Sequence, residues 1–257
     1  FGLEAAISGR NDITACGRKF SGNAFYQRGA RELYERMVEA GKAHGVTDYD
    51  YNFDQPWILK LPAPHAGVCQ MTHMRGYDGL DPVDLSAALI EGRRRVHDAV
   101  RFLQCHVPEF VDMHLDQTAE MLGVRETRRI HGLYELTMDD LREGRRFEDG
   151  ICVCAFNVDI HQPDGTSQEK SEDYRMKPYH IPYRCLVPVG ADNLLMAGRC
   201  ISGSFEAHAS YRVTGDCVAM GQAAGTAAAL ALSRGVSTAA LDGRDVAAAM
   251  VRQGAKV

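Results

Sequence analysis

The 257-residue sequence lacks several features that mark common classes of protein. No apolar run approaches the roughly 20 residues that span a bilayer, so we expect no membrane span. Lysine and arginine (29) are fewer than aspartate and glutamate (34), and a net charge of −5 does not favour nucleic-acid binding, which needs a concentrated basic surface. The chain begins at Phe1 without a basic segment followed by an apolar one, so we expect no secretory signal and a cytoplasmic protein.

The eight cysteines form no CxxC pair and are too sparse for a disulfide scaffold. The closest pair, Cys152 and Cys154, would share one face of a strand, where two thiols cannot easily bridge. The sequence therefore predicts no metal site and reduced, mostly buried thiols. A redox or metal-binding role for Cys152 and Cys154 remains an alternative.

The sequence also contains no G-x-G pair, since no two of its 25 glycines are two positions apart. A GxGxxG loop, which cradles the diphosphate of a dinucleotide at a helix N-terminus, is therefore missing, together with the acidic residue that follows it. This absence excludes a complete dinucleotide-binding domain of that type within the chain.

Hydrophobic periodicity and turn residues predict a mixed order of helices and strands. A strand, a glycine-containing turn and a long alanine-rich helix near the C-terminus are typical of an α/β fold. We expect helices over 28–44, 81–106, 214–232 and 243–250, and strands over 57–61, 68–71, 151–160, 182–189 and 193–197.

The segment around residues 193–225 carries the clearest chemical signal. A buried strand over 193–197 would deliver Gly198 at its carboxyl end, where open α/β sheets bind ligands. The next helix opens near Thr214, whose hydroxyl can cap it, and its free N–H groups would face the same crevice. Gly221 and Gly225 would let this helix approach a sheet or a cofactor closely. The alternative is a small-residue packing helix with no ligand.

These residues resemble the C-terminal segment that closes over the cofactor in FAD-dependent oxidoreductases of the two-dinucleotide-binding-domain type, which include fumarate reductase-like flavoproteins. The resemblance covers residues 28–257. Seven further motifs follow its pattern in order: Met71-Thr72 with Arg75-Gly76, Asp81–Leu85, Gly92–Arg94, Pro108–Phe110, Gly123–Arg129, Glu143–Phe147 and Ile181–Leu186.

The resemblance implies a partial FAD-binding domain, with its N-terminal GxGxxG half absent, and a substrate or cap domain with α+β elements. It places a segment of uncertain origin and a helix at 1–46, the cap domain at 47–177 and the FAD-binding part at 178–257. The implied cofactor is FAD. The implied cofactor-binding residues are Gly198, Arg199, Arg212, Val213, Thr214, Gly221 and Gln222.

Candidate catalytic residues are His180, Arg184 and Arg129. Guanidinium groups in the segment 125–129 suit a substrate carboxylate, although a salt-bridged structural corner explains them equally well. His180 suits a general acid or base near flavin N5, or a plain hydrogen-bonded histidine. Glu206 and His208 are further candidates near the flavin.

The favoured function is hydride transfer through flavin N5 on a small, possibly carboxylate-bearing substrate, by a C-terminal portion or a split subunit. The main alternative is a non-catalytic subunit or remnant that binds a partner chain or a second copy and no cofactor. A third, weaker alternative comes from residues 8–13 and 17–26, which are similar to a short segment of lipoate–protein ligases. Turns at Asn11-Asp12 and Gly17-Arg18 equally suit simple hairpins.

Overall fold

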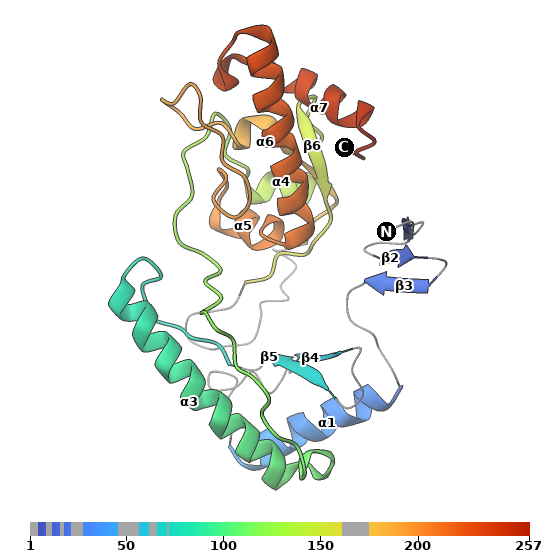
Figure 1. Cartoon of the computed structure of the whole chain (residues 1–257), viewed down its shortest axis with the longest axis vertical. Coiled ribbons are helices and arrows are strands. Elements are labelled where there is room, and N and C mark those ends of the chain that lie inside the picture. Colours follow the sequence, from blue (N-terminus) through green and yellow to red (C-terminus); the bar gives the residue numbers. More distant parts are fainter. Residues whose placement is uncertain are drawn as a thin grey trace. The chain divides into compact units, whose positions relative to one another are not determined.

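The computed structural model (Figure 1) forms two compact units, each described here by itself. The first unit comprises Phe1–Tyr77, Val83–Leu122 and Pro163–Thr166, and the second comprises Asp78–Pro82, Gly123–Gln162 and Ser167–Val257. The predicted domain boundaries at residues 46 and 177 stay a prediction. The structure describes residues 5–8, 12–15, 18–21, 28–45, 57–61, 66–70, 72–160 and 175–257.

All strand pairs of the first unit are antiparallel among the described residues. Strands β1, β2 and β3 form a three-stranded sheet in that order, which agrees with the predicted hairpins, and β4 pairs with β5 as the predicted strands require. The strands are β1 (Ala5–Ser8), β2 (Asp12–Ala15), β3 (Arg18–Ser21), β4 (Trp57–Lys60) and β5 (Gly67–Gln70).

Two helices of the first unit lie where periodicity predicts them. Helix α1 spans Arg28–Ala43, and α3 spans Pro82–His106, beginning at a proline as the first helical position allows. A short 3₁₀ turn, η1 (Pro108–Phe110), follows α3. Met37 of α1 packs with Leu103 and Val107 in a small apolar core, which fixes the two helices to each other.

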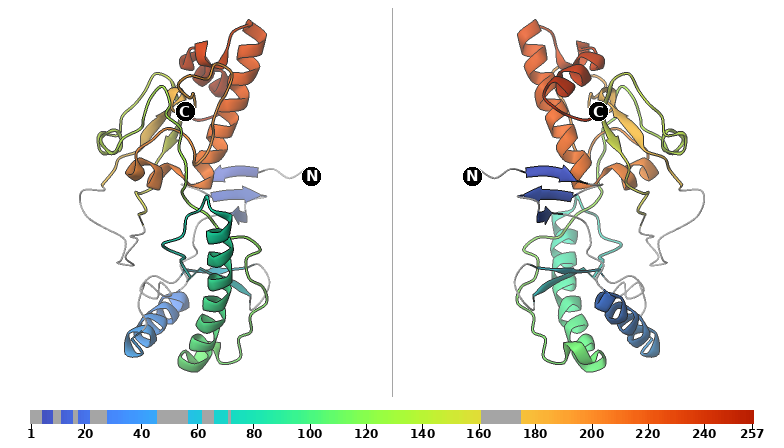
Figure 2. Two further views of the ribbon diagram at one scale, coloured as in Figure 1. Left: turned by 90° about the vertical axis from the view of Figure 1, so that its left-hand side faces the viewer. Right: turned by 90° about the vertical axis from the view of Figure 1, so that its right-hand side faces the viewer.

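The second unit is built on a two-stranded antiparallel ribbon covered by helices. Helices α6 and α7 both pack against β6, and Figure 2 shows α6 lying along the ribbon in both views. The described elements are α4 (Met138–Glu143), β6 (Gly150–Cys154), β7 (Tyr179–Pro182), η3 (Tyr183–Cys185), α5 (Phe205–Tyr211), α6 (Thr214–Arg234), η4 (Thr238–Ala240) and α7 (Gly243–Arg252). This mixture of helices and small sheets is compatible with the predicted α/β class.

The helices predicted over 214–232 and 243–250 are confirmed, but the strand predictions need correction. The expected strand 151–160 ends at Cys154, because its partner β7 starts at Tyr179, opposite that residue. The strand expected over 182–189 instead occupies Tyr179–Pro182, and the 3₁₀ turn η3 with irregular backbone after it replaces the rest. The Leu186 N–H closes that turn by donating to the Tyr183 carbonyl, 2.8 Å away.

The predicted buried strand over 193–197 is wrong. The segment has no strand partner among the described residues, and the Leu194 side chain is 49% exposed. Single hydrogen bonds hold it instead: the Met196 N–H donates to the Leu186 carbonyl, and the Ala239 N–H donates to the Asp192 carbonyl. This short apolar run has the composition of a strand, but it forms no backbone pairing with another strand among the described residues.

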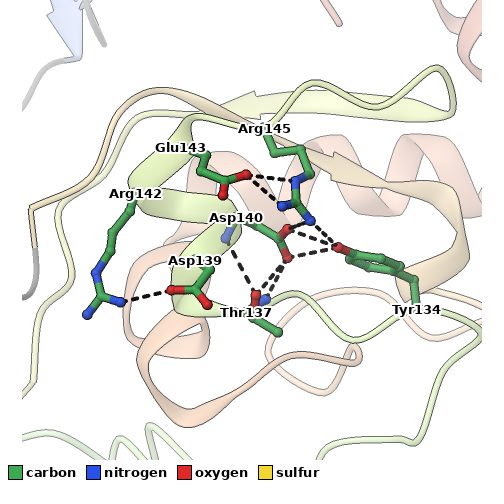
Figure 3. Close-up of polar contacts among 7 residues, drawn as sticks. All are labelled: Tyr134, Thr137, Asp139, Asp140, Arg142, Glu143 and Arg145. Carbon is green, nitrogen blue, oxygen red and sulfur yellow. Dashed lines mark hydrogen bonds and ion pairs between the residues drawn. The ribbon is translucent and has the colours of Figure 1, made fainter.

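The buried carboxylate of Asp140 caps the N-terminus of the short helix α4 (Figure 3). Asp140 is 0% exposed and pairs with Arg145 at 2.5 Å. The Tyr134 hydroxyl donates to it at 2.9 Å, and the backbone N–H of Thr137 donates to it at 2.9 Å in a capping box. A charge out of water is tolerable only when its lone pairs are satisfied in this way. The network is therefore structural.

We predict that Asp140→Ala destabilises the chain by about 2–4 kcal/mol, because the Thr137 N–H and the Tyr134 hydroxyl lose their acceptor at the start of α4. Urea unfolding measures the change. The matched control is Asp139→Ala, because the exposed Asp139 pairs only with Arg142 at the surface and should cost about 0.5 kcal/mol or less. Equal losses in both variants would contradict a structural role for the buried network.

Candidate functional site

The first turn of α6 presents backbone N–H groups that no side chain caps. The sequence predicts that the Thr214 hydroxyl caps this helix, and the structure corrects that expectation. The N-cap is Val213 (φ −78°, ψ 152°), whose side chain offers no acceptor, and Thr214 is the first helical residue. The first N–H groups of an uncapped helix need another acceptor and carry the positive end of the helix dipole.

Gly198 lies against this turn. Its φ of +95° is in the left-handed region, which favours glycine. A Cβ at Gly198 would lie 3.8 Å from Sγ of Cys217, and the Gly198 N–H lies 3.2 Å from Sδ of Met220. The predicted juxtaposition of Gly198 with the start of α6 is therefore present, although an irregular segment, rather than a strand, delivers it.

Four arginines lie near His208 and the end of α5, just before α6, and we call them the arginine cluster. Residues 129–130 come alongside Gly198 because the Ile130 N–H donates to the Cys200 carbonyl at 3.0 Å. Helix α5 ends at Arg212, whose N–H donates to the His208 carbonyl at 3.1 Å. Three separate segments thus converge. The arginine cluster consists of Arg125, Arg129, Arg199 and Arg212.

Two carboxylates accompany the arginine cluster. Glu126 accepts from Arg129, and Asp159 lies 3.6 Å from Arg125. Arg212 donates to the Asp159 backbone carbonyl at 2.5 Å and stands 3.8 Å from its carboxylate. The structure thus supports a salt-bridged corner at residues 125–129, one of the two interpretations that the sequence left open.

His208 is the buried titratable group of this site. Its side chain is 1% exposed, and Nδ1 has no hydrogen-bond partner; Oε2 of Glu126 is 3.8 Å away. The pKa of His208 is lowered to about 4, mainly by burial and also by Arg212 and Arg129, while the attraction of Glu126 acts to raise it. The imidazole is therefore neutral at pH 7.

A second buried group lies beneath the first turn of α6. Asp216 has a buried oxygen, Oδ2, with no hydrogen-bond partner, and burial raises the pKa of this carboxyl to about 6. Burial also raises the pKa of the Cys154 thiol to about 12 and that of Cys152 well above its ordinary value. Thiols of this kind are poor nucleophiles, which favours the structural interpretation of both cysteines.

His180 and Arg184 lie on another part of the ribbon. The imidazole Nδ1 of His180 sits 3.2 Å from the Phe147 N–H and 3.1 Å from its carbonyl. Arg184 forms a two-pronged ion pair with Asp149, at 2.9 and 3.1 Å. Among the described residues, no hydrogen bond or ion pair joins either side chain to the arginine cluster. Their catalytic roles stay predictions, and their contacts account for both side chains structurally.

Gly221 and Gln222 lie one to two turns along α6. A Cβ at Gly221 or Gly225 would meet no described atom within 4 Å, so the small-residue face is exposed in the described structure. Gln222 donates to Gln253 of α7 at 3.1 Å. The buried face of the helix is formed instead by Met220, Ala223, Thr226, Ala227 and Ala231.

The part of the chain that the structure describes lacks two other kinds of functional feature. No group of three or more His, Cys, Asp or Glu side chains able to hold a metal occurs in the part of the chain that the structure describes. Within those same residues, each helix is too short or too polar to cross a membrane.

Comparison with known proteins identifies the family. The model of the FAD dependent oxidoreductase family matches residues 13–250, so the chain belongs to that family. Membership implies FAD as the cofactor and oxidoreduction as the general function. No curated protein and no solved structure matches the chain.

The family match confirms the predicted resemblance to FAD-dependent oxidoreductases at the level of the family. The fumarate reductase-like subtype stays a prediction. The comparisons give no support to the lipoate–protein ligase segment, and residues 13–26 fall inside the flavoprotein match. Sequence reasoning missed the Asp159 partner of Arg212 and the burial of Asp216; an acid in the first helical turn was the available signal for the latter.

We predict that His208 makes stability depend on pH. The unfolded imidazole has a pKa of about 6.5, so the unfolded chain binds more protons than the folded chain between pH 4 and 6.5. The contribution of the neutral imidazole is present above pH 6.5 and is lost as the pH falls towards 4. Asp216 acts in the opposite direction, because its pKa is raised on folding, so wild type must be compared with a variant.

Urea unfolding of wild type and His208→Gln from pH 4.5 to 7.5 measures this contribution. The stability of wild type relative to the variant should rise with pH by on the order of 2 kcal/mol. His131→Gln, at an exposed position of the same unit, is the control and should show no such trend. A difference independent of pH would contradict a neutral, buried His208.

Proposed function

We propose that this chain forms the flavin-side part of an FAD-dependent oxidoreductase, in which the first turn of α6 binds the pyrimidine edge of the isoalloxazine ring. The observation that carries the proposal is the uncapped turn itself. Val213 supplies no side-chain acceptor, and the next residues, Thr214 and Gly215, are exposed.

The residues of this turn fit such a ring edge. A Cβ at Gly215 would meet no described atom within 4 Å, so a ligand can approach the backbone there. Gly198, in its left-handed conformation, lies close to Cys217 of α6 and is followed by the exposed Arg199. We assign Gly198, Arg199, Arg212, Val213 and Thr214 to the cofactor. Gly221 and Gln222 belong to this assignment only if the cofactor reaches along the exposed face of α6.

FAD, when bound, supplies hydride transfer at N5, with negative charge developing at N1 and the C2 carbonyl. The N–H groups of the first turn would donate hydrogen bonds to that edge of a bound flavin, and the helix dipole would add positive potential there. Both would favour the reduced form and raise its potential. Arg212 adds a positive charge immediately before the turn and is only 12% exposed.

For the substrate we propose a small molecule, with a carboxylate as its recognised group. We assign this carboxylate to Arg129, which precedes Ile130, whose N–H donates to the Cys200 carbonyl two residues after Gly198. A guanidinium there can orient a carboxylate by a two-pronged contact. Roles for His180 and Arg184 require the substrate to extend to the ribbon.

The experiment is a titration of the purified chain with FAD, followed by the quenching of flavin fluorescence. We expect saturable binding of about one flavin per chain. We also expect FMN to bind within a few-fold of FAD, because the sequence has no glycine loop for the adenosine side. Absence of saturable binding by both cofactors would overturn the proposal and favour a partner-binding subunit without a cofactor.

Gly215→Asp tests the turn directly. A carboxylate at this position occupies the free N–H groups and complements the helix dipole, so the fold should be preserved or slightly stabilised. Flavin affinity should fall at least about tenfold, because the donors are occupied and the charge repels an electron-rich edge. Ala248→Asp, at an exposed position of α7, adds the same charge elsewhere and should leave affinity unchanged.

A further inference from the structure

We propose that the arginine cluster binds an oxyanion group, a carboxylate or a phosphate, and that the buried imidazole of His208 takes up a proton from solvent when it binds. This inference deepens the proposed function and rests on it in one respect, since Arg129 is also the residue proposed to hold the substrate carboxylate; it adds proton uptake by His208 and a site that can fill without flavin. Its residues come from the segment before α4, the Gly198 turn and helix α5, all within the second unit.

The first argument is an imbalance of charge. Within this group of described residues, four guanidinium groups face the two carboxylates of Glu126 and Asp159. Two of the arginines are held mainly by neutral atoms: Arg199 donates to the Val124 carbonyl, and Arg212 donates to that of Asp159. Four clustered cations that share two carboxylates repel one another, and an oxyanion relieves that repulsion.

The second argument is an unsatisfied atom inside the cluster. Nδ1 of His208 is buried without a hydrogen-bond partner, although the carboxylate of Glu126 is 3.8 Å away. In a neutral imidazole only one of the two ring nitrogens carries a proton, so Nδ1 has none to donate in the Nε2–H tautomer, whereas in the imidazolium both nitrogens carry one. A small contraction would then bring Nδ1–H to the carboxylate.

Burial, and after it the arginines, keep His208 neutral until the site fills. The charged groups that act on it are Glu126, which favours the proton, and Arg212, Arg129 and Arg199, which oppose it. The edge of the Tyr211 ring packs against it at 5.5 Å between centroids. An added anion cancels part of the arginine field, so binding of the anion and protonation of His208 favour each other.

The test uses sulfate, an oxyanion that does not titrate between pH 5.5 and 7.5, and measures its dissociation constant by calorimetry on the full chain without flavin. We expect the affinity for sulfate to rise about threefold or more as the pH falls across that range. In His208→Gln this dependence should be lost. The imidazole NMR signal of His208 in wild type should also titrate at higher pH with sulfate than without it, which keeps the test valid if the variant does not fold.

Arginine variants locate the site. Arg125→Gln and Arg142→Gln form a matched pair, because both side chains are 47% exposed and both are ion-paired. The first should weaken sulfate binding about tenfold and the second should not change it. Equal affinities in the two variants would mean an adventitious ion only and would overturn the proposal.

Competition distinguishes the sources of the oxyanion. Displacement of sulfate by succinate supports a substrate carboxylate, and displacement by pyrophosphate supports a cofactor phosphate; displacement by neither overturns the proposal. Since none of these measurements uses flavin, their failure leaves the assignment of the α6 turn to FAD intact. Loss of flavin binding would in turn leave the oxyanion site intact.

Discussion

Burial of one face of α6 against the β6–β7 ribbon is the constraint on which the candidate site depends. Met220, Ala223 and Ala227 are fully buried there, and small side chains let the helix lie close to the ribbon. Once this face is fixed, the first turn has a defined position, and Gly198 and Arg212 are held beside it. A shift of the helix by one residue would rotate its small residues away from the ribbon and move the free N–H groups with them.

The second unit contains two groups of charged residues that differ in how completely their hydrogen bonds and ion pairs are satisfied. Asp140 is completely buried, yet every interaction that a carboxylate needs is supplied by Arg145, Tyr134 and the start of α4. The arginine cluster is less buried, yet its cations are incompletely matched and His208 has an unsatisfied nitrogen. A satisfied network stabilises one conformation, whereas an unsatisfied one stores an electrostatic cost that a ligand can relieve. The contrast separates the structural site from the functional one.

The helices of this chain could be predicted from the sequence, and the strands only in part. Helix α3 follows from Asp81-Pro82 and its apolar spacing, and α6 from an alanine-rich run that ends at Gly235. These signals are local. The segment 193–197 has the composition of a strand but no pairing partner, and pairing is a property of the tertiary structure that local sequence does not encode.

The site shows the same division between local and tertiary information. Gly198 and the helix start near Thr214 are visible as motifs because backbone geometry restricts the residue types there. The hydrogen bond from Arg212 to the Asp159 carbonyl joins positions 53 residues apart, and no local spacing in the sequence predicts it. His208 was recognisable as a candidate from its place before the helix, but its burial, which makes its nitrogen unsatisfied, follows only from the packing of α5.

The missing glycine loop constrains how a dinucleotide can be held. Affinity for FAD normally combines two attachments, one at the flavin and one at the diphosphate, and the second gains from the effective concentration that the first creates. This sequence has no two glycines two positions apart, so it does not supply the usual diphosphate loop. Hydrogen bonds from the first turn of α6 add about 1 kcal/mol each, which suffices to orient a ring but not to retain a dinucleotide against dilution. On the proposed assignment, the first turn of α6 therefore orients and tunes the flavin, and tight retention of FAD needs a second attachment of another kind.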